Sequence, residues 1–200
     1  MDWKIHDKQL LYDGHFKVTK YKLTHEKFDG ETTAVVQREL VARNDAVAMV
    51  AYDPYTDELV LVEQFRIGAI NEEQPWLIEV VAGLIEDGES PEDVTIRECQ
   101  EEIGCRPSEL LKIGGFYTSP GGNSEWIHLY IGKVSVSELA ESGGLDHEGE
   151  DINIIVVPGS DIPYMLSTGE IRSAIAIIGL QWFVMNQQNI RQQWCSDQAK

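Results

Sequence analysis

The stretch Gly83–Cys105, GLIEDGESPEDVTIRECQEEIGC, combines a glycine-containing loop with a segment rich in carboxylates. Ser90, followed by Pro91 and by an acidic residue at position 93, is typical of a helix N-terminus, because the hydroxyl caps the first turn and proline suits its first position. Gly104 is suited to end the helix. The stretch therefore predicts a helix from about residue 91 to residue 103.

This predicted helix has an acidic face. Glu98 and Glu102 are four residues apart and therefore lie one above the other, with Glu101 beside them. Like charges at this spacing destabilise an isolated helix by about 0.2–0.5 kcal/mol per pair, so the cluster needs a cation, and Mg²⁺ or Mn²⁺ prefers oxygen ligands. Arg97 precedes Glu101 by four residues and can orient that carboxylate. The alternative is an acidic helix face in water, the usual outcome of a run of charges.

The same stretch resembles the Nudix box, Gly-x5-Glu-x7-Arg-Glu-U-x-Glu-Glu-x-Gly-U, in which U is aliphatic. All seven fixed positions are present, at Gly83, Glu89, Arg97, Glu98, Glu101, Glu102 and Gly104. With each residue type at roughly 5–10% usage, a chance match is on the order of 10⁻⁸ per start position. The two U positions hold Cys99 and Cys105, small apolar residues that suit a packed helix face.

Composition narrows the class of protein. The chain has 200 residues, 42% of them hydrophobic, which is enough for one domain with a full core and a small appendage. Its net charge of −18 opposes binding to nucleic acid or to anionic membranes. Three cysteines, a polar N-terminus and the absence of an apolar run of about 18 residues predict a cytoplasmic protein with structural thiols. The five histidines show no zinc-ligand spacing.

Alternating polar and apolar residues from about Leu10 to Arg43, with a turn at Asp29-Gly30, predict a hairpin of a small antiparallel sheet. Ala46–Tyr52 and Leu59–Arg66, joined by the turn Asp53–Asp57, predict a second, valine-rich hairpin. Further strands are expected at Trp76–Ala82, near Leu111–Thr118 and Glu125–Val134, and at Ile152–Pro158, followed by a short helix at Gly159–Ser167 and a long one from Glu170 to about Gln193.

This order of elements resembles the Nudix α/β/α sandwich, a mixed β-sheet between helices, preceded by the small N-terminal antiparallel β domain of the ADP-ribose pyrophosphatase branch. We assign residues 1–44 to the β domain and residues 45–200 to the Nudix hydrolase domain. In that branch the N-terminal sheet packs or is exchanged across a homodimer. A short isolated sheet is only marginally stable, which independently favours a partner surface. We therefore expect a homodimer.

The segment Ser119-Pro120-Gly121-Gly122 interrupts a β pattern with turn-forming residues, and its glycines allow a close approach of backbone to a ligand. A plain hairpin connection would have similar residues. Pro120 lies sixteen residues beyond Gly104, and a proline at about that distance is similar to the mark of ADP-ribose pyrophosphatases. The resemblance implies that Ser119 and Gly121 bind substrate and that Glu125 contacts its distal sugar.

The acidic loop Asp146–Asp151, DHEGED, follows glycines 143 and 144 and contains Gly149. Such glycines keep a loop mobile, as a lid over an active site requires. The resemblance implies that Glu148 is the catalytic base and that Glu150 is a further metal ligand. The alternative is an acidic loop that faces water.

Arg38, with its neighbour Glu39, and Arg66 each lie at the end of a β pattern. The planar guanidinium suits a diphosphate or a purine edge, although a lone arginine is more often part of a surface ion pair. In similar enzymes the arginine corresponding to Arg38 reaches the adenosine end across the dimer, and the one corresponding to Arg66 lies near the phosphates. His15 stands where relatives carry an aromatic residue that stacks on adenine.

The resemblance implies hydrolysis of the diphosphate of ADP-ribose to AMP and ribose 5-phosphate, with two or three Mg²⁺ ions per site and Mn²⁺ as a substitute. The expected ligands are Glu98, Glu102, Glu150 and the backbone carbonyl of Ala82, with Glu101 and Arg97 in support. GDP-mannose or another nucleoside diphosphate sugar is the alternative substrate. A non-catalytic module that senses ADP-ribose is the alternative of another class.

Overall fold

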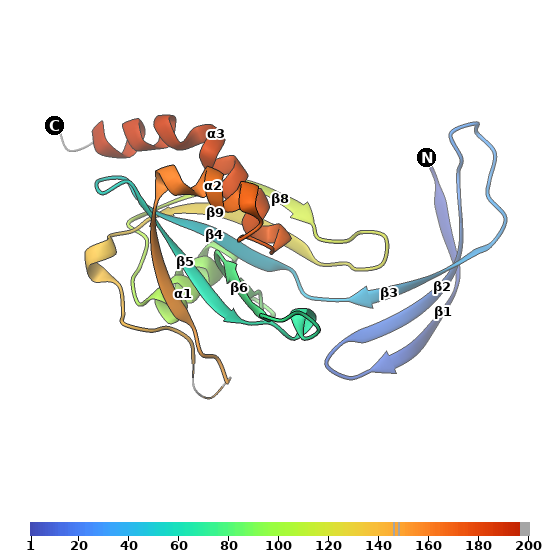
Figure 1. Ribbon diagram of the computed structural model, residues 1–200. Helices are drawn as coiled ribbons and strands as arrows, with labels where there is room; N and C mark the ends of the chain where they lie inside the picture. The colour runs from blue at the N-terminus through green and yellow to red at the C-terminus, as the bar shows by residue number, and fades with distance from the viewer. Residues whose placement is uncertain (146, 148, 197–200) are drawn as a thin grey trace. The chain divides into compact units, whose positions relative to one another are not determined.

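The computed structural model describes residues 1–145, 147 and 149–196 (Figure 1). Contacts between Cα atoms divide it into two compact units. The first consists of Met1–Asp45 and Tyr117–Trp126, and the second of Ala46–Phe116 and Ile127–Lys200. The segment with the Ser119–Gly122 turn therefore groups with the N-terminal residues, although it lies far from them in the sequence.

The first unit contains an antiparallel sheet in the order β1-β2-β3, formed by β1 (Trp3–Asp13), β2 (Lys17–His25) and β3 (Val36–Ala42). The expected antiparallel pair around the turn at Asp29-Gly30 is present as β2 and β3, but the residues from about Leu10 belong to a further strand, β1, which a single hairpin does not include. The first turn lies at residues 14–16, and Gly30, with φ of 83°, lies in the longer connection between β2 and β3. Nearly every β1 residue is exposed, so the strand has no polar–apolar alternation to mark it.

The second unit contains a mixed sheet. Over the described residues its strands are β4 (Ala46–Asp53), β5 (Glu58–Phe65), β6 (Trp76–Glu79), β7 (Val81–Leu84), β8 (Glu109–Tyr117), β9 (Trp126–Lys133) and β10 (Asn153–Pro158). The order is β10-β5-β4-β9-β8, with β6 paired to β5 and β7 paired to β4. The β4–β9 pair is parallel, whereas β4–β5 and β5–β10 are antiparallel. The single strand expected at Trp76–Ala82 is divided at Val80, because its two halves pair with different neighbours.

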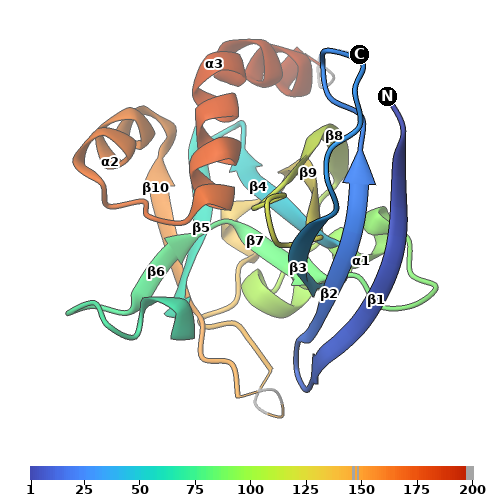
Figure 2. The same ribbon diagram turned by 90° about the vertical axis from the view of Figure 1, so that its right-hand side faces the viewer.

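Helices cover both faces of this sheet. Alternate residues of the fully buried strand β4 belong to two separate core clusters, as a strand with two covered faces requires. One cluster includes residues of α2 (Ile162–Thr168) and α3 (Ala174–Ser196), and the other includes residues of α1 (Pro91–Ile103). Figure 2 shows α2 and α3 on one side of the strands and α1 on the other. The predicted α/β/α sandwich is confirmed.

The ends of α1 agree with the prediction. The Ser90 hydroxyl accepts a hydrogen bond from the Asp93 N–H at 3.1 Å, and Pro91 occupies the first turn. Gly104 ends the helix with φ of 78°, a left-handed conformation that glycine adopts readily. The two ends of α1 are therefore fixed, and with them the positions of the carboxylates on its acidic face.

The C-terminal helix α3 begins at Ala174, four residues later than the expected start at Glu170. It is the longest helix among the described residues, with 23 residues, and none of the described helices is long and apolar enough to cross a membrane.

Asp57 connects the β4–β5 turn to α3. Its carboxylate accepts hydrogen bonds from the Tyr52 hydroxyl at 2.7 Å, the Gln187 amide at 2.9 Å and Arg191 Nη1 at 2.7 Å. Its φ of 64° is left-handed, a conformation that aspartate and asparagine tolerate better than most residues. Burial alone would raise the pKa of Asp57, but the hydrogen bonds from Tyr52 and Gln187 and the charge of Arg191 lower it below 3.8.

Asp57→Asn keeps the side-chain shape and the tolerated backbone conformation but removes the charge. We expect it to lower the free energy of unfolding at pH 7 by about 1.5–3 kcal/mol, the range for hydrogen bonds to a charged group. Because folding lowers the pKa of Asp57, this contribution is present above the unfolded value of 3.8 and is lost as pH falls through the folded value. The measurement is chemical denaturation at pH 7 and at a series of values below pH 4.

The matched control is Asp13→Asn at the exposed end of β1, where we expect a change within about 0.5 kcal/mol. Equal stability of the Asp57 variant and the native chain at pH 7 would contradict the structural role of this carboxylate.

Candidate active site

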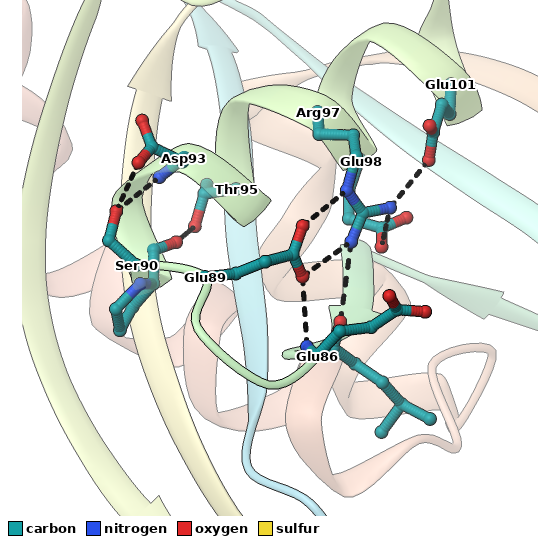
Figure 3. Close-up of polar contacts among 10 residues, drawn as sticks. Glu86, Glu89, Ser90, Asp93, Thr95, Arg97, Glu98 and Glu101 are labelled. Carbon is teal, nitrogen blue, oxygen red and sulfur yellow. Dashed lines mark hydrogen bonds and ion pairs between the residues drawn. The ribbon is translucent and has the colours of Figure 1, made fainter.

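The guanidinium of Arg97 lies among the carboxylates of α1 and the loop before it (Figure 3). Its Nη1 is 2.8 Å from Glu98 Oε1 and 2.9 Å from Glu101 Oε2, and its Nε is 3.4 Å from Glu89 Oε1. The contact with Glu101 has the geometry that the spacing of four predicts. One positive charge is thus shared among three negative ones, and the cluster as a whole stays negative.

Glu102 is almost completely buried, with 2% of its surface exposed. Its Oε2 accepts a hydrogen bond from the Ala82 N–H on β7 at 3.1 Å. Burial raises the pKa of Glu102 well above its ordinary value, and repulsion from Glu98 and Glu150 adds to the effect, whereas the Ala82 hydrogen bond opposes it. α1 therefore holds the Glu102 carboxylate against β7, where the hydrogen bond from Ala82 does not fully offset the cost of burying its negative charge.

Glu98 is in a similar environment. Burial raises its pKa to about 7 despite the opposing effect of Arg97, and the charges of Glu101 and Glu150 raise it further. Its carboxylate lies so close to Gly83 on β7 that a Cβ at position 83 would overlap it. The glycine that begins the box is therefore required for the close approach of Glu98 to the strand.

Glu150 belongs to the same group of charges, because it acts on the pKa of both Glu98 and Glu102. Glu148, the expected base, lies outside the described residues, as does Asp146. The two glycines before this loop, Gly143 and Gly144, lie against the end of α1. Gly144 N–H donates to Glu101 O at 3.0 Å, and a Cβ at Gly143 would overlap the backbone of Glu102, so this part of the chain packs closely on the end of α1.

The donor set fits a hard divalent cation. Among residues 1–145, 147 and 149–196, no three His, Cys, Asp or Glu side chains form a ready-made metal-binding group. Glu98, Glu102 and Glu150 nevertheless bring three carboxylates within electrostatic reach of one another, two of them with raised pKa values. Carboxylate oxygens are the ligands that Mg²⁺ prefers, and a cation would stabilise the charged forms that burial disfavours.

Cys99 and Cys105, which replace aliphatic residues of the box, are buried free thiols in the core cluster that includes α1. The hydrogen bond between them, together with burial, raises the pKa of Cys99. Both therefore pack as small apolar residues, as the sequence predicts.

Arg66 lies directly after β5, on the same unit as the carboxylates. Its Nε donates to Glu79 Oε2 on β6 at 2.6 Å, and its positive charge opposes the raised pKa of Glu102. No pattern in the sequence indicates a role for Glu79. Glu79 meets Arg66 only because β5 pairs with β6, and the spacing of residues along the sequence does not reveal that pairing.

The remaining predicted substrate residues belong to the first unit. The Ser119–Gly122 turn lies along β3, since the Val41 N–H donates to Gly122 O at 2.8 Å. Arg38 and Glu39 are on the same strand, and Arg38 Nη1 donates to its neighbouring carbonyl, Gln37 O, at 2.7 Å. The structure thus places Arg38, Glu39, Ser119 and Gly121 in one local region of this unit.

Glu125 and His15 are connected through two residues that the sequence analysis did not identify, Arg43 and Phe16. Glu125 is 8% exposed and its Oε1 lies 3.2 Å from Arg43 Nε. The Arg43 guanidinium lies 5.3 Å from the centre of the Phe16 ring, and the His15 ring meets Phe16 edge-on at 4.7 Å between centres. Nothing in the sequence indicates a role for Arg43, because an arginine after a strand pattern is common and Arg43 lies in no recognisable motif.

Comparisons with known proteins identify the family of this chain. The NUDIX domain family model matches residues 42–172. The chain is 40% identical to an ADP-ribose pyrophosphatase of Haemophilus influenzae over 197 residues, covering 96% of this chain and 91% of the relative. It is 38% identical to the ADP-ribose pyrophosphatase of Escherichia coli strain K12 over 194 residues, covering 96% and 93%.

A GDP-mannose pyrophosphatase of Escherichia coli O1:K1 is 34% identical over 182 residues, covering 89% of this chain and 93% of the relative. A crystal structure of an ADP compounds hydrolase has the same fold, with a TM-score of 0.70 at 20% identity over 93% of this chain and 96% of the other. The intact box, the α/β/α sandwich and the extent of these matches lead to one conclusion: the chain belongs to the Nudix family of hydrolases.

Proposed function

We propose that this protein hydrolyses the diphosphate of ADP-ribose to AMP and ribose 5-phosphate in a reaction that depends on Mg²⁺. The observation that carries the proposal is the pair formed by the buried Glu102 and the partly buried Glu98, held between α1 and β7 with raised pKa values. The similarity to ADP-ribose pyrophosphatases over 96% of the chain supports the choice of substrate.

Glu98, Glu102, Glu150 and the backbone carbonyl of Ala82 would hold two or three Mg²⁺ ions, or Mn²⁺ in their place. The bound cations supply charge neutralisation for the diphosphate and activation of a water molecule. Arg97 and Glu101 keep the ligands oriented through the ion pairs at 2.8 and 2.9 Å.

Glu148 would accept the proton of the attacking water, as a general base. Arg66 would contact the diphosphate, since its guanidinium lies near enough to act on Glu102. Arg38, Glu39, Ser119, Gly121, Glu125 and His15 would bind the nucleoside and the distal sugar.

GDP-mannose is the second candidate substrate, supported by the GDP-mannose pyrophosphatase that is 34% identical to this chain. The lower identity and coverage of that relative favour ADP-ribose. A sensing module that binds ADP-ribose without cleaving it is disfavoured, because every fixed position of the box is intact and its carboxylates are held together.

We also propose that the chain acts as a cytoplasmic homodimer that uses its N-terminal sheet for association. The first unit supports this, since its sheet and loops expose large apolar side chains: Trp3, Leu10, Tyr12, Phe28 and Val35 are 55–96% exposed. Sedimentation velocity at micromolar concentration measures the oligomeric state, and a monomer there would contradict a stable dimer.

A panel of ADP-ribose, GDP-mannose, ADP-glucose and NADH tests the activity directly. We expect release of phosphatase-accessible phosphate from ADP-ribose with Mg²⁺, weaker release from the others, and none with EDTA. A preference for GDP-mannose would keep the chemistry and change the substrate. If every compound stays intact while the protein binds metal normally, the proposed function is wrong.

Gly83→Ala tests the approach of Glu98 to β7. The added methyl group overlaps the Glu98 carboxylate, so we expect Mn²⁺ affinity, measured by electron paramagnetic resonance, to fall by roughly 10- to 100-fold, with the rate falling in parallel. Gly114→Ala on β8 is the matched control, because a Cβ there meets no atom within 4 Å. Unchanged Mn²⁺ affinity in Gly83→Ala would contradict the assignment of Glu98 as a ligand.

Glu148→Gln tests the assignment of the base. We expect Mn²⁺ binding to stay normal while kcat falls by roughly 10²- to 10⁴-fold, the contribution typical of a general base. A variant with a near-native rate would show that another group takes the proton.

A further inference from the structure

The side chain of Arg66 is held at one of its nitrogens only. Its Nε donates to Glu79 Oε2 at 2.6 Å, and among the described residues the structure shows no second hydrogen-bond or ion-pair partner for the guanidinium. The side chain of Arg66 is 42% exposed, whereas that of Glu79 is only 13% exposed. The buried carboxylate thus binds the inner nitrogen and leaves the two outer ones for a ligand.

The pairing of β5 with β6 places both residues on the face of the sheet that α1 covers. Glu79 lies directly across from Val62, which belongs to the core cluster that includes α1 residues. Successive side chains of a strand alternate between faces, so Arg66, four residues beyond Val62, points to the same side. The positive charge of Arg66 accordingly reaches Glu102 on α1.

The backbone around Arg66 is fixed from another part of the chain. The Arg66 N–H donates to Pro75 O at 3.0 Å. Arg172, in the segment before α3, donates through Nη2 to the carbonyls on both sides of Pro75, at 2.6 Å to Gln74 O and 3.3 Å to Trp76 O. Arg172 therefore holds the start of β6, and the turn that carries Arg66 is attached to the same place through Pro75 O.

We infer that Glu79 and Arg172 are positioning residues for Arg66, so that its two outer nitrogens face a diphosphate. Glu79 fixes the direction of its guanidinium, and Arg172 holds the start of β6, to which the Arg66 backbone is hydrogen-bonded. The inference rests on the proposed function, because it assigns Arg66 to the diphosphate of that substrate. A guanidinium held by a carboxylate at Nε presents its outer nitrogens as a rigid fork, the geometry that phosphate oxygens match. Small displacements of such a group are costly to an enzyme.

Glu79→Gln tests the first part. The amide oxygen can still accept from Arg66 Nε, but the hydrogen bond is no longer an ion pair, so the direction of the guanidinium is held less firmly. We expect the Kd for ADP-ribose, measured by calorimetry in EDTA where no turnover occurs, to rise roughly 10- to 100-fold. With Mg²⁺ we expect KM to rise more than kcat falls, because the diphosphate carries its charge in the ground state as well. Mn²⁺ affinity should stay unchanged.

A double-mutant cycle separates positioning from a merely structural ion pair. If Glu79 acts through Arg66, Glu79→Gln should have no further effect on ADP-ribose binding in an Arg66→Ala background. Glu79→Asp, which keeps the charge, should recover part of the affinity. Glu73→Gln, a carboxylate-to-amide change at an exposed residue of the neighbouring loop, is the matched control and should bind as the native chain does.

Arg172→Ala tests the second part without touching the ion pair, and it keeps the inference testable if Glu79→Gln does not fold. We expect a several-fold rise in KM that is also absent in the Arg66→Ala background. Native affinity in Glu79→Gln, or an equal loss with and without Arg66, would overturn the inference while the native enzyme stays active. A native protein that neither binds nor hydrolyses ADP-ribose would instead overturn the proposed function together with the role given to Arg66.

Discussion

The burial of two like charges between α1 and β7 is the constraint on which the rest of the structure depends. Glu102 is 2% exposed and accepts a hydrogen bond from the Ala82 N–H, whereas Glu98 is mostly buried and shares Arg97 with two other carboxylates. Carboxylates are rarely buried without a full counter-charge. Position 83 lacks a side chain so that Glu98 can approach β7, and Arg97 restrains the surrounding carboxylates. These features are consistent with a site that is completed by cations.

The two faces of the sheet differ in whether their carboxylates have enough hydrogen-bond donors and positive charges around them. On the side of α3, Asp57 receives three hydrogen bonds and pins the helix to the β4–β5 turn. On the side of α1, the carboxylates exceed the positive charge available from Arg97 and Arg66. Proteins commonly violate the rule of full satisfaction only where function requires it. The contrast supports the proposal that the chemistry takes place on the α1 face.

Much of this could be predicted from the sequence, because the decisive signals are local. Ser90 and Gly104 bound α1 through capping chemistry, and the spacing of Arg97 and Glu101 produces their ion pair. The elements that were missed depend on tertiary pairing. β1 is exposed along nearly its whole length and has no alternation, and the strand at 76–84 changes partner at Val80 without a change in composition. The contact between Arg66 and Glu79 likewise exists only because β5 pairs with β6.

The most direct test of this account is the thermal unfolding of the native chain and of Glu102→Gln, each with EDTA and with Mg²⁺. Glutamine keeps an oxygen for the Ala82 N–H but removes a buried charge. If the buried carboxylates bind cations, Mg²⁺ will raise the Tm of the native chain, and Glu102→Gln will be more stable than the native chain in EDTA and will no longer respond to Mg²⁺. If Mg²⁺ does not change the Tm of the native chain, and Glu102→Gln is less stable than the native chain in EDTA, the buried carboxylates stabilise the fold and do not bind a metal.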